Sequence, residues 1–339
     1  MLDDGCGLDP PLITPWIMSV AAVVWHRSPH FHKRHCLFTG ATPVLLRRIA
    51  SLFAMRAKTL AHLSDLHIGL SYRNEQAARM ICNALLENAI DDVVITGDIT
   101  HRGRLSELRT FQAIFAPLFE ARKICVVPGN HDRLGDDVAE ALMPGCRVDV
   151  HSTDGLHVVR VDSTGPQNYS FVAGHGEIDQ EIVDRVGIAL QNASEDCLRV
   201  AMIHHHPLPL PEETLVEWFV EKMGWPYAAE LSLGRRLLDR AAGICDLVLH
   251  GHRHIPREIC FATGERPLLV YNAGSSTELM RFRVFRHAEG RLLGSPTWMD
   301  VRGTSAGIDT EPDLVPAYAT PRLGVAAAVA SRELDEVVG

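Results

Sequence analysis

The feature that most constrains this chain is an apolar strand that ends in metal-ligand side chains. Residues 63–69 read Leu-Ser-Asp-Leu-His-Ile-Gly and follow an apolar run that begins near Thr59. Residues two apart in a strand point to the same side, so Asp65 and His67 present a carboxylate and an imidazole together where this strand ends. Such oxygen and nitrogen donors suit a divalent metal of intermediate softness. A single Asp-x-His is equally compatible with a solvated surface loop.

Four later strands end in the same way, in Asp, Asn or His. The segments after them are residues 97–103, 129–132, 204–207 and 250–254. The carboxyl ends of neighbouring strands meet at one edge of an open α/β sheet, which is where such sheets bind ligands. Chance would have to place ligand-type residues at the same end of five separate strands. The pattern therefore predicts one shared metal site.

Between these strand ends the pattern alternates between strand and helix. Strands are predicted from residue 59 and at 92–96, 124–127, 156–161, 198–203, 246–249, 268–271 and 281–286. Helices are predicted at 75–90, 107–121, 178–193, 213–222 and 228–242. This order is typical of parallel sheets joined by crossover helices, so the sequence predicts an α/β fold.

Composition restricts the class of protein. The chain has 339 residues, of which 46% are hydrophobic and 22% charged, as in an ordinary globular protein of one large or two small domains. Its net charge of −9 argues against bulk attraction to nucleic acid or acidic lipid. The eight cysteines include no Cys-x-x-Cys pair, which favours free thiols in a reducing compartment over a disulfide framework. We therefore expect a cytoplasmic protein.

Three parts are predicted along the chain: 1–54, 55–302 and 303–339. The first is rich in His, Arg, Pro and Trp without a clear period, and we interpret it as a poorly ordered extension or a mis-set start ahead of Met55. Its apolar stretch, 15–25, is too short to span a bilayer and lacks the basic region of a secretory signal. The last part is expected to be a loosely ordered tail.

The ordered set of motifs resembles the calcineurin-like metallophosphoesterase superfamily. The motifs are Asp-x-His, Gly-Asp-x-x-x-Arg-Gly, Gly-Asn-His-Asp, His-x-Pro and Gly-His-x-His, within residues 60–277. The forms Ser-Asp-Leu-His and Gly-Asp-Ile-Thr are most similar to the bacterial class III cyclic-nucleotide phosphodiesterases. The resemblance implies a four-layer α/β/β/α sandwich with the metals at the carboxyl ends of the strands.

The resemblance also implies which side chains bind two divalent metal ions. The implied ligands of one metal are Asp65, His67 and His254, those of the other are Asn130, His205 and His252, and Asp98 bridges both. Counting back from Pro207 in the His-x-Pro motif selects His205, and a slip of one residue would select His204 instead. Asp, Asn and His ligands suit Mn²⁺, Fe²⁺ or Zn²⁺.

The implied reaction is hydrolysis of a phosphodiester, of the cyclic-nucleotide or glycerophosphodiester type, by in-line attack of a metal-bridging hydroxide. His131 matches the family histidine that contacts the phosphate or protonates the leaving oxygen. Arg102 is a candidate phosphate clamp, because its planar guanidinium suits bidentate contact. Related protein phosphatases have an Asp at the position of His101 that pairs with this catalytic histidine, so the orientation of His131 stays open.

Other activities are compatible with the same motifs. They include a phosphomonoesterase and a nucleotide-sugar or lipid pyrophosphohydrolase. A non-catalytic metal-binding scaffold is disfavoured because every ligand position is filled, and a nuclease is disfavoured by the acidic balance and the lack of a basic stripe. The expected partner is a small-molecule phosphoester, with no transmembrane segment, and the sequence does not predict the oligomeric state.

Several further residues have structural interpretations. His62 is expected to pack within its strand and His250 to hydrogen-bond behind the ligands. His175 is a candidate residue of the cleft. An aromatic-rich segment, 208–227, is expected to be an amphipathic helix packed on the core, with a cap that selects the substrate as the alternative.

Overall fold

The computed structural model describes residues 57–170, 173–209 and 231–301. The chain divides into two compact units, 1–54 and 55–339, and all of the described residues belong to the second. The predicted extension 1–54, the tail 303–339 and the helix at 213–222 lie outside the described residues, as does almost all of the aromatic segment 208–227.

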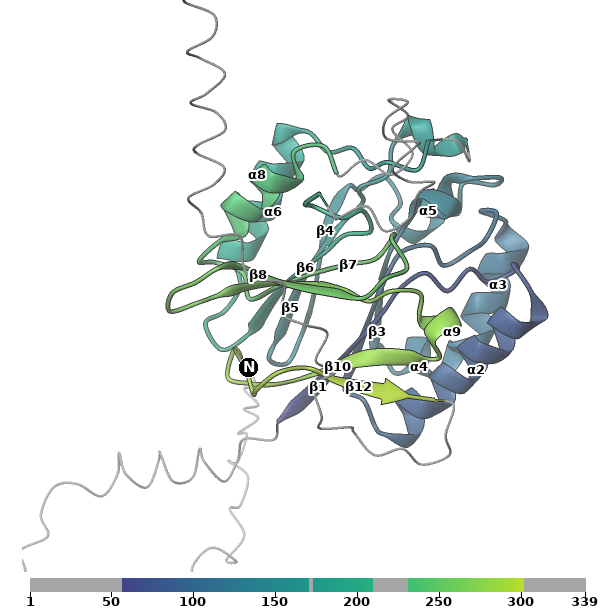
Figure 1. Cartoon of the computed structure of the whole chain (residues 1–339), viewed down its shortest axis with the longest axis horizontal. Coiled ribbons are helices and arrows are strands. Elements are labelled where there is room, and N and C mark those ends of the chain that lie inside the picture. The colour runs from purple at the N-terminus through teal and green to yellow at the C-terminus, as the bar shows by residue number, and fades with distance from the viewer. Residues whose placement is uncertain (1–56, 171–172, 210–230, 302–339) are drawn as a thin grey trace, which may run out of the picture. The chain divides into compact units, whose positions relative to one another are not determined.

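Two six-stranded sheets form the centre of the fold (Figure 1). The first has the order β11-β10-β1-β2-β3, with β12 paired to β10. Its strands are β1 (Lys58–Leu63), β2 (Asp92–Thr96), β3 (Ile124–Val127), β10 (Arg281–Ala288), β11 (Arg291–Leu292) and β12 (Thr297–Asp300). Strands β1, β2 and β3 are parallel, so their carboxyl ends lie at one edge, and β10 runs antiparallel to β1.

The second sheet has the order β4-β5-β6-β7-β9-β8. Its strands are β4 (Val148–Thr153), β5 (Leu156–Val161), β6 (Leu198–Met202), β7 (Leu247–His250), β8 (Arg257–Ala262) and β9 (Leu268–Asn272). The four central strands are parallel, and the edge strands β4 and β8 pair antiparallel with their neighbours. Both sheets therefore contain the parallel strands that the alternating pattern predicts.

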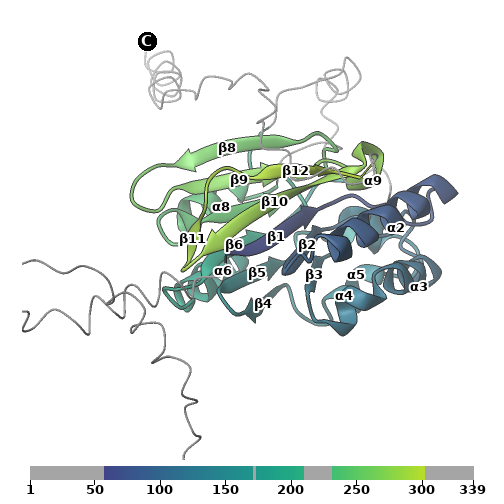
Figure 2. The same ribbon diagram turned by 90° about the horizontal axis from the view of Figure 1, so that it is seen from below.

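Helices cover the outer faces of the two sheets (Figure 2). These are α2 (Tyr72–Glu87), α3 (Leu105–Ile114) and α4 (Ala116–Glu120) on the first sheet, and α6 (Gln180–Gln191) and α8 (Gly234–Ala241) on the second. A third apolar cluster, with Leu60 and Phe285 from the first sheet and Val158 and Leu249 from the second, fills the space between the sheets. The predicted four-layer α/β/β/α sandwich is confirmed. In the described part of the chain, no helix is long and apolar enough to cross a membrane.

Local signals explain where the helices begin and end. Helix α2 begins after Ser71, whose side chain accepts a hydrogen bond from Asn74 N. It buries Ala78, Ile81 and Leu85 at helical spacing, as the sequence predicts. The helix predicted at 107–121 is wrong in one respect, because it is divided into α3 and α4. Proline supplies no backbone N–H, and Pro117 lies in the first turn of α4, where none is needed.

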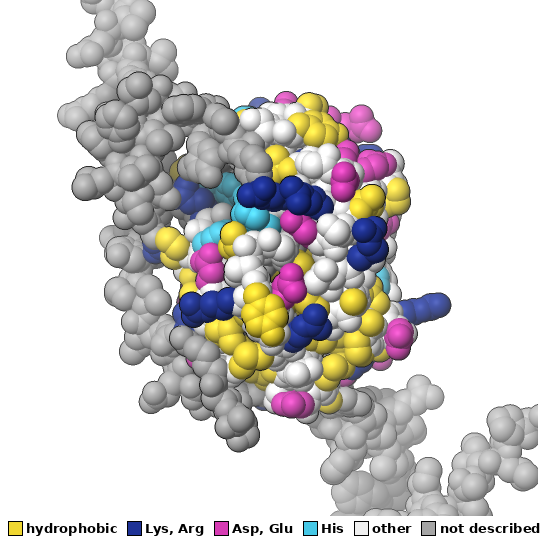
Figure 3. Space-filling view, turned by 90° about the vertical axis from the view of Figure 1, so that its right-hand side faces the viewer, with side chains coloured by type: hydrophobic (Ala, Val, Ile, Leu, Met, Phe, Trp, Pro, Cys, Tyr) yellow, Lys and Arg dark blue, Asp and Glu magenta, His cyan; other side chains and the backbone are white. Residues whose placement is uncertain are grey.

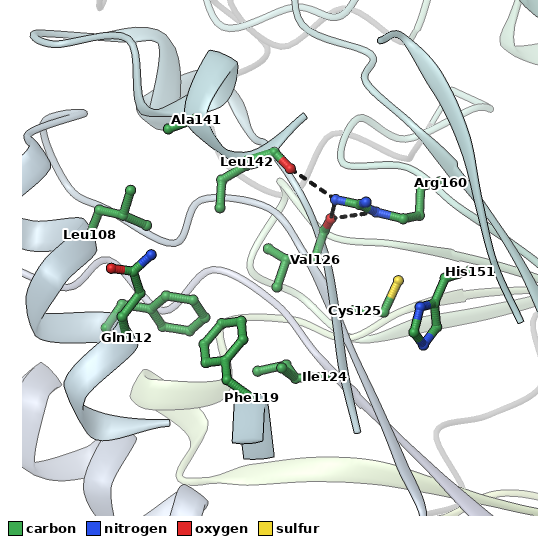
Figure 4. Close-up of a pocket in the computed structure, with 11 residues that line it drawn as sticks. Leu108, Gln112, Phe119, Ile124, Cys125, Val126, Ala141, Leu142, His151 and Arg160 are labelled. Carbon is green, nitrogen blue, oxygen red and sulfur yellow. Dashed lines mark hydrogen bonds between the residues drawn. The ribbon is translucent and has the colours of Figure 1, made fainter. Parts of the chain in front are cut away.

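A cavity of about 260 Å³ lies beside the free edge of β3 (Figure 4). Apolar side chains such as Phe111 and Phe119 line it, and Arg160 reaches it from β5. Arg160 Nη2 donates to Val126 O at 2.6 Å and to Leu142 O at 3.0 Å, so the arginine caps a carbonyl of this edge strand. The described lining residues include no predicted metal ligand, which makes this cavity part of the scaffold.

Buried His62 in β1 is expected to make stability sensitive to acid. Its Nε2 donates to Thr96 Oγ1 at 3.0 Å. Burial, followed by the charges of His250 and Arg283, lowers the pKa of His62 well below its ordinary value of 6.5. Below pH 6.5 the unfolded chain therefore binds a proton that the folded chain does not bind, and the free energy of unfolding should decrease as pH falls.

Urea unfolding of the protein and of His62→Gln, measured between pH 7.5 and pH 5.5, tests this expectation. The variant should lose up to about 1.4 kcal/mol per pH unit of the acid dependence, since it has no group to protonate. Identical pH slopes for the two proteins would contradict the assignment.

Candidate metal centre

The five segments predicted from the sequence meet at one rim of the molecule, where the two sheets adjoin. Within the first sheet Asp65 N donates to Gly97 O at 3.1 Å, and within the second Gly251 N donates to His204 O at 3.0 Å. The two sheets are joined directly, because His252 N donates to the Asp65 carboxylate at 3.1 Å. In Figure 3 histidine side chains gather in one area of the surface, beside lysine or arginine side chains.

Three of the predicted ligands form a first group. The ligand atoms of Asp65, His67 and His254 lie within 4.8 Å of one another. His254 Nε2 lies 3.0 Å from His67 Nε2 and 3.5 Å from Asp65 Oδ1. An oxygen and two imidazole nitrogens thus converge on one point, as a divalent cation requires.

A second group lies on the other side of Asp98. His204 Nε2 is 3.1 Å from Asn130 Oδ1 and 3.3 Å from His252 Nδ1. Asp98 Oδ2 lies 3.5 Å from His204 Nε2 and 3.8 Å from Nε2 of His67, which belongs to the first group. The Asp98 carboxylate therefore faces both groups.

Of the two histidines that the His-x-Pro motif offers, His204 is the one whose ring faces Asp98 and Asn130. The Nδ1 atom of His205 lies 2.8 Å from Ser163 Oγ, and in the described residues it is His204 that reaches Asp98 and Asn130. His205 remains close by, because its ligand atom lies within 4.8 Å of those of His204 and His252. His204 Nδ1 donates to Thr96 O at 2.7 Å, which leaves Nε2 as the atom free to bind a metal.

The backbone at the predicted ligands adopts an uncommon conformation. Five of these residues have positive φ: Asp65 (54°), His67 (47°), Asp98 (49°), His252 (75°) and His254 (54°). Non-glycine residues seldom occupy this left-handed region, and each such residue costs about 1–3 kcal/mol that the surrounding structure must offset. The clustering of this strain in one place is typical of a functional site.

Two glycines permit the close approach of the segments. A Cβ atom at Gly251 would overlap Ser64 Oγ and crowd Asp65 Oδ2, at the point where the two sheets meet. A Cβ atom at Gly97, which has a φ of +89°, would lie 2.5 Å from His204 Nδ1. Any larger residue at either position would displace a predicted ligand.

Two buried carboxylates, Asp65 and Asp98, make positive charge in the centre electrostatically favourable. Burial opposes ionisation of Asp65 and Asp98, but nearby histidines more than offset it and lower the pKa of both groups, through His254 and His204 respectively. Burial likewise opposes protonation of His204 and His254. Even so, Asp98 raises the pKa of His204 to about 9, and Asp65 raises the pKa of His254 to about 11. Divalent cations bound here would supply the same positive charge, so the donor set and the electrostatics both fit metal binding.

His131 lies beside the first group, with its ring centroid 4.7 Å from that of His67. Its Nδ1 donates to His101 O at 2.8 Å, and its backbone N donates to Asp98 Oδ1 at 2.9 Å. The carbonyl of His101 thus orients the ring of His131 beside the first group.

Arg102, the predicted phosphate clamp, is exposed at the rim of the centre. Its backbone N donates to Glu107 Oε2 at 2.9 Å. Burial, His131 and Arg102 together lower the pKa of His101, the residue next to Arg102. A role for Arg102 as a phosphate clamp remains a prediction.

Asp132 supports the centre although it is not among the residues predicted from the sequence. Its carboxylate accepts hydrogen bonds from Gly129 N at 2.9 Å, Thr100 N at 2.9 Å and Thr100 Oγ1 at 2.6 Å. These bonds join the loop that carries Asp98 to the loop that carries Asn130. Burial and the charge of Asp98 raise the pKa of Asp132 to about 6. Asp132 is the fourth residue of the Gly-Asn-His-Asp motif, and this position was the sequence signal that could have identified it.

The remaining histidines occupy supporting positions. His62 is buried in β1, and His250 is buried with its Nδ1 3.4 Å from Asn272 Nδ2, as expected for both. His175 is partly buried, and its carbonyl accepts hydrogen bonds from Gln167 and Asn168. A role for His175 in the cleft remains a prediction.

The chain is similar to known phosphoesterases. The model of the calcineurin-like phosphoesterase family matches residues 58–256. The 3',5'-cyclic adenosine monophosphate phosphodiesterase CpdA of Pseudomonas aeruginosa is 33% identical over 129 residues, which cover 36% of this chain and 42% of CpdA. The DNA double-strand break repair protein Mre11 of Archaeoglobus fulgidus is 32% identical over 91 residues, 23% of this chain and 20% of Mre11. The matches thus span less than half the length of either relative.

Among solved structures, the purple acid phosphatase PPD1 from yellow lupin seeds superposes with a TM-score of 0.53 at 12% sequence identity. The superposition covers 75% of this chain and 53% of the phosphatase. At this identity the likeness is one of fold.

Proposed function

Because the chain belongs to the calcineurin-like phosphoesterase family, we propose that it is a metal-dependent hydrolase of phosphodiesters of the cyclic-nucleotide or glycerophosphodiester type. The observation that carries the proposal is the position of Asp98, whose Oδ2 lies 3.8 Å from His67 Nε2 and 3.5 Å from His204 Nε2. A carboxylate with nitrogen donors on both sides suits a pair of cations about 3.5–4 Å apart.

The proposed ligands fall into two sets that share Asp98. One cation is held by Asp65, His67 and His254, the other by Asn130, His204 and His252. Mn²⁺, Fe²⁺ and Zn²⁺ all accept such mixed oxygen and nitrogen donors. When bound, the two cations supply a nucleophilic water near neutral pH and offset the charge of the phosphoryl oxygens.

The chain itself supplies proton transfer and orientation. His131 is the proposed proton donor to the departing oxygen, because its ring lies beside that of His67 and the His101 carbonyl fixes its orientation through Nδ1. The backbone N–H of His131 also binds Asp98 Oδ1, so the shared ligand and the proton donor are held together. Arg102, at the exposed rim, is the proposed contact to a phosphate oxygen.

One observation supports a diester as the substrate class. CpdA, which is 33% identical to this chain over 129 residues, is named for its action on cyclic adenosine monophosphate.

An activity panel after reconstitution with Mn²⁺ tests the proposal. The panel contains bis(p-nitrophenyl) phosphate, cyclic nucleotides, glycerophosphodiesters, phosphomonoesters and pyrophosphates. We expect kcat/KM for the best diester to exceed that for the best monoester at least about tenfold, a difference of 1.4 kcal/mol in transition-state stabilisation. Addition of a chelator should abolish the activity.

Faster turnover of monoesters or pyrophosphates would replace the diester proposal by one of those activities. A folded, metal-loaded protein that is inert on the whole panel would indicate a non-catalytic scaffold.

A further inference from the structure

A short turn after β9 contacts the ligand loops on one side of the centre. Within it, α9 (Ser276–Leu279) is a single helical turn, and Ser275 caps it by accepting a hydrogen bond from Glu278 N at 3.4 Å. The turn lies beyond residue 256, where the match to the family model ends. The comparisons therefore assign it no role.

The turn fixes the loop that carries Asp65. Ser275 Oγ donates to Asp65 O at 2.9 Å. Ser276 N donates to Ser64 O at 3.0 Å, and Ser64 N donates in return to Ser276 Oγ at 3.1 Å. Ser275 and Ser276 are fully buried, so these hydrogen bonds are shielded from water. The backbone on either side of the Asp65 side chain is thus held by residues from the far end of the domain.

The same turn contacts His254 from outside. Ser275 N donates to His254 O at 3.4 Å, and Glu278 Oε2 lies 3.6 Å from His254 Nδ1. The other ring nitrogen, Nε2, faces the ligand group, 3.5 Å from Asp65 Oδ1 and 3.0 Å from His67 Nε2. The imidazole of His254 therefore lies between the Glu278 carboxylate and the proposed metal position.

We propose that Glu278 is a positioning residue that strengthens metal binding at the Asp65–His67–His254 group by holding the His254 ring with Nε2 toward the metal. This inference rests on the ligand assignment of the proposed function. A carboxylate beside the outer nitrogen of a ligating histidine fixes its tautomer and orientation and raises its basicity. Loss of such a partner typically lowers metal affinity about 10–100-fold.

The two groups differ in how their histidines are supported. In the other group, His204 Nδ1 donates to the backbone carbonyl of Thr96 at 2.7 Å, a partner that no side-chain substitution removes. Glu278 is a side chain, and it is 52% exposed. A substitution there can change one metal position without disturbing the core or the second position.

Calorimetric titration of the metal-free protein with Mn²⁺ tests the inference. Glu278→Gln, which keeps the size of the side chain and removes its charge, should weaken one of two binding events about 10–100-fold and leave the other unchanged. Glu120→Gln is the matched control, because Glu120 is an exposed glutamate at the end of α4, and it should change neither event. Unchanged affinities in Glu278→Gln, or equal weakening of both events, would overturn the inference.

Two further backgrounds assign the effect to a position. In Asn130→Ala, which removes a ligand of the other group, Glu278→Gln should still weaken Mn²⁺ binding by the same factor. In His254→Ala the additional effect of Glu278→Gln should vanish, because the histidine through which Glu278 acts is absent. An effect that persists in His254→Ala would show that Glu278 acts by another route and would refute the inference.

The result of the Mn²⁺ titration does not depend on which substrate the protein hydrolyses. A shift in Mn²⁺ affinity with no turnover of any phosphodiester would support the role of Glu278 and refute only the proposed reaction. Diester turnover together with unaltered Mn²⁺ affinity in Glu278→Gln would support the proposed reaction and refute the role of Glu278. If both proposals hold, excess Mn²⁺ should restore kcat in the variant, since Glu278 positions a ligand and does not contact the substrate.

Discussion

Replacement of Asp98 by alanine is expected to abolish phosphodiester hydrolysis, with a loss in kcat/KM of about 1,000-fold or more, equivalent to about 4 kcal/mol of transition-state stabilisation. The effect should be this large because one side chain serves three contacts. Its Oδ2 faces His67 and His204, one in each ligand group, and its Oδ1 accepts the backbone N–H of His131. The substitution therefore removes a ligand from both metal positions and releases the proposed proton donor.

Metal content measured together with kcat/KM checks this result. The wild-type protein should hold two Mn²⁺ ions per chain after dialysis, and Asp98→Ala should hold less than one, as expected for loss of a ligand shared by a two-metal site. Asp98→Asn retains the volume of the side chain and should give the same result, which separates loss of the charge from loss of packing. Asp196→Ala, at an exposed aspartate before β6, is the control and should retain both metals and activity. Two bound metals and near-normal turnover in Asp98→Asn would contradict the role assigned to Asp98.

The strands that the sequence predicts most accurately are the buried ones. The bounds predicted for β2, β3 and β5, at 92–96, 124–127 and 156–161, agree with the structure. These segments are apolar runs rich in β-branched residues, and all five residues of β2 are buried. Burial on both faces makes such runs recognisable without knowledge of their neighbours.

The strands that were missed are edge or half-exposed strands. Strand β8 alternates between exposed and partly buried residues, β12 is mostly half-buried, and each is stabilised by antiparallel pairing, with β9 and β10 respectively. Edge strand β4 pairs with β5 through a turn at Asp154-Gly155, a dipeptide that favours hairpins and was the available signal for β4. Strands β8 and β12 also pair with strands nearby in the chain, but their residues are mostly exposed or half-buried, so the apolar pattern that identifies buried strands is absent from them.

The centre could be predicted in outline because each ligand segment comes directly after a strand. Its supporting residues could not, since their contacts join segments far apart in the chain. Asp132 binds the loop of Thr100, 32 residues away, and Ser275 binds Asp65, 210 residues away. Glu278 has no motif around it, and only the folded turn places it beside His254. The left-handed backbone of the ligand residues is likewise a product of the folded loops.

The choice between His204 and His205 shows the limit of motif counting and leads to the second large expected effect. Three successive histidines offer two registers to a His-x-Pro motif, and the turn of the chain after β6 places His204 nearer to Asp98 and Asn130. His204→Gln is expected to lose one of the two bound metals and to lower kcat/KM about 1,000-fold, because His204 Nε2 faces both Asn130 and Asp98. His205→Gln should keep both metals and lower kcat/KM by no more than about 10–100-fold, the scale of a supporting residue.

The pair of variants is matched in chemistry and in burial, because both histidines are fully buried and each change replaces a ring with an amide. Glutamine at position 205 can still bond Ser163 Oγ, which lies 2.8 Å from His205 Nδ1 in the protein. Metal content per folded chain, and the rise in Tm on addition of Mn²⁺, should therefore separate ligand loss from loss of packing. A ligand that binds only the folded state stabilises it by mass action, so the rise should stay normal in His205→Gln and shrink in His204→Gln. The opposite pattern would return the ligand to His205, and it would require a turn after Met202 different from the one that carries Gly251 N to His204 O.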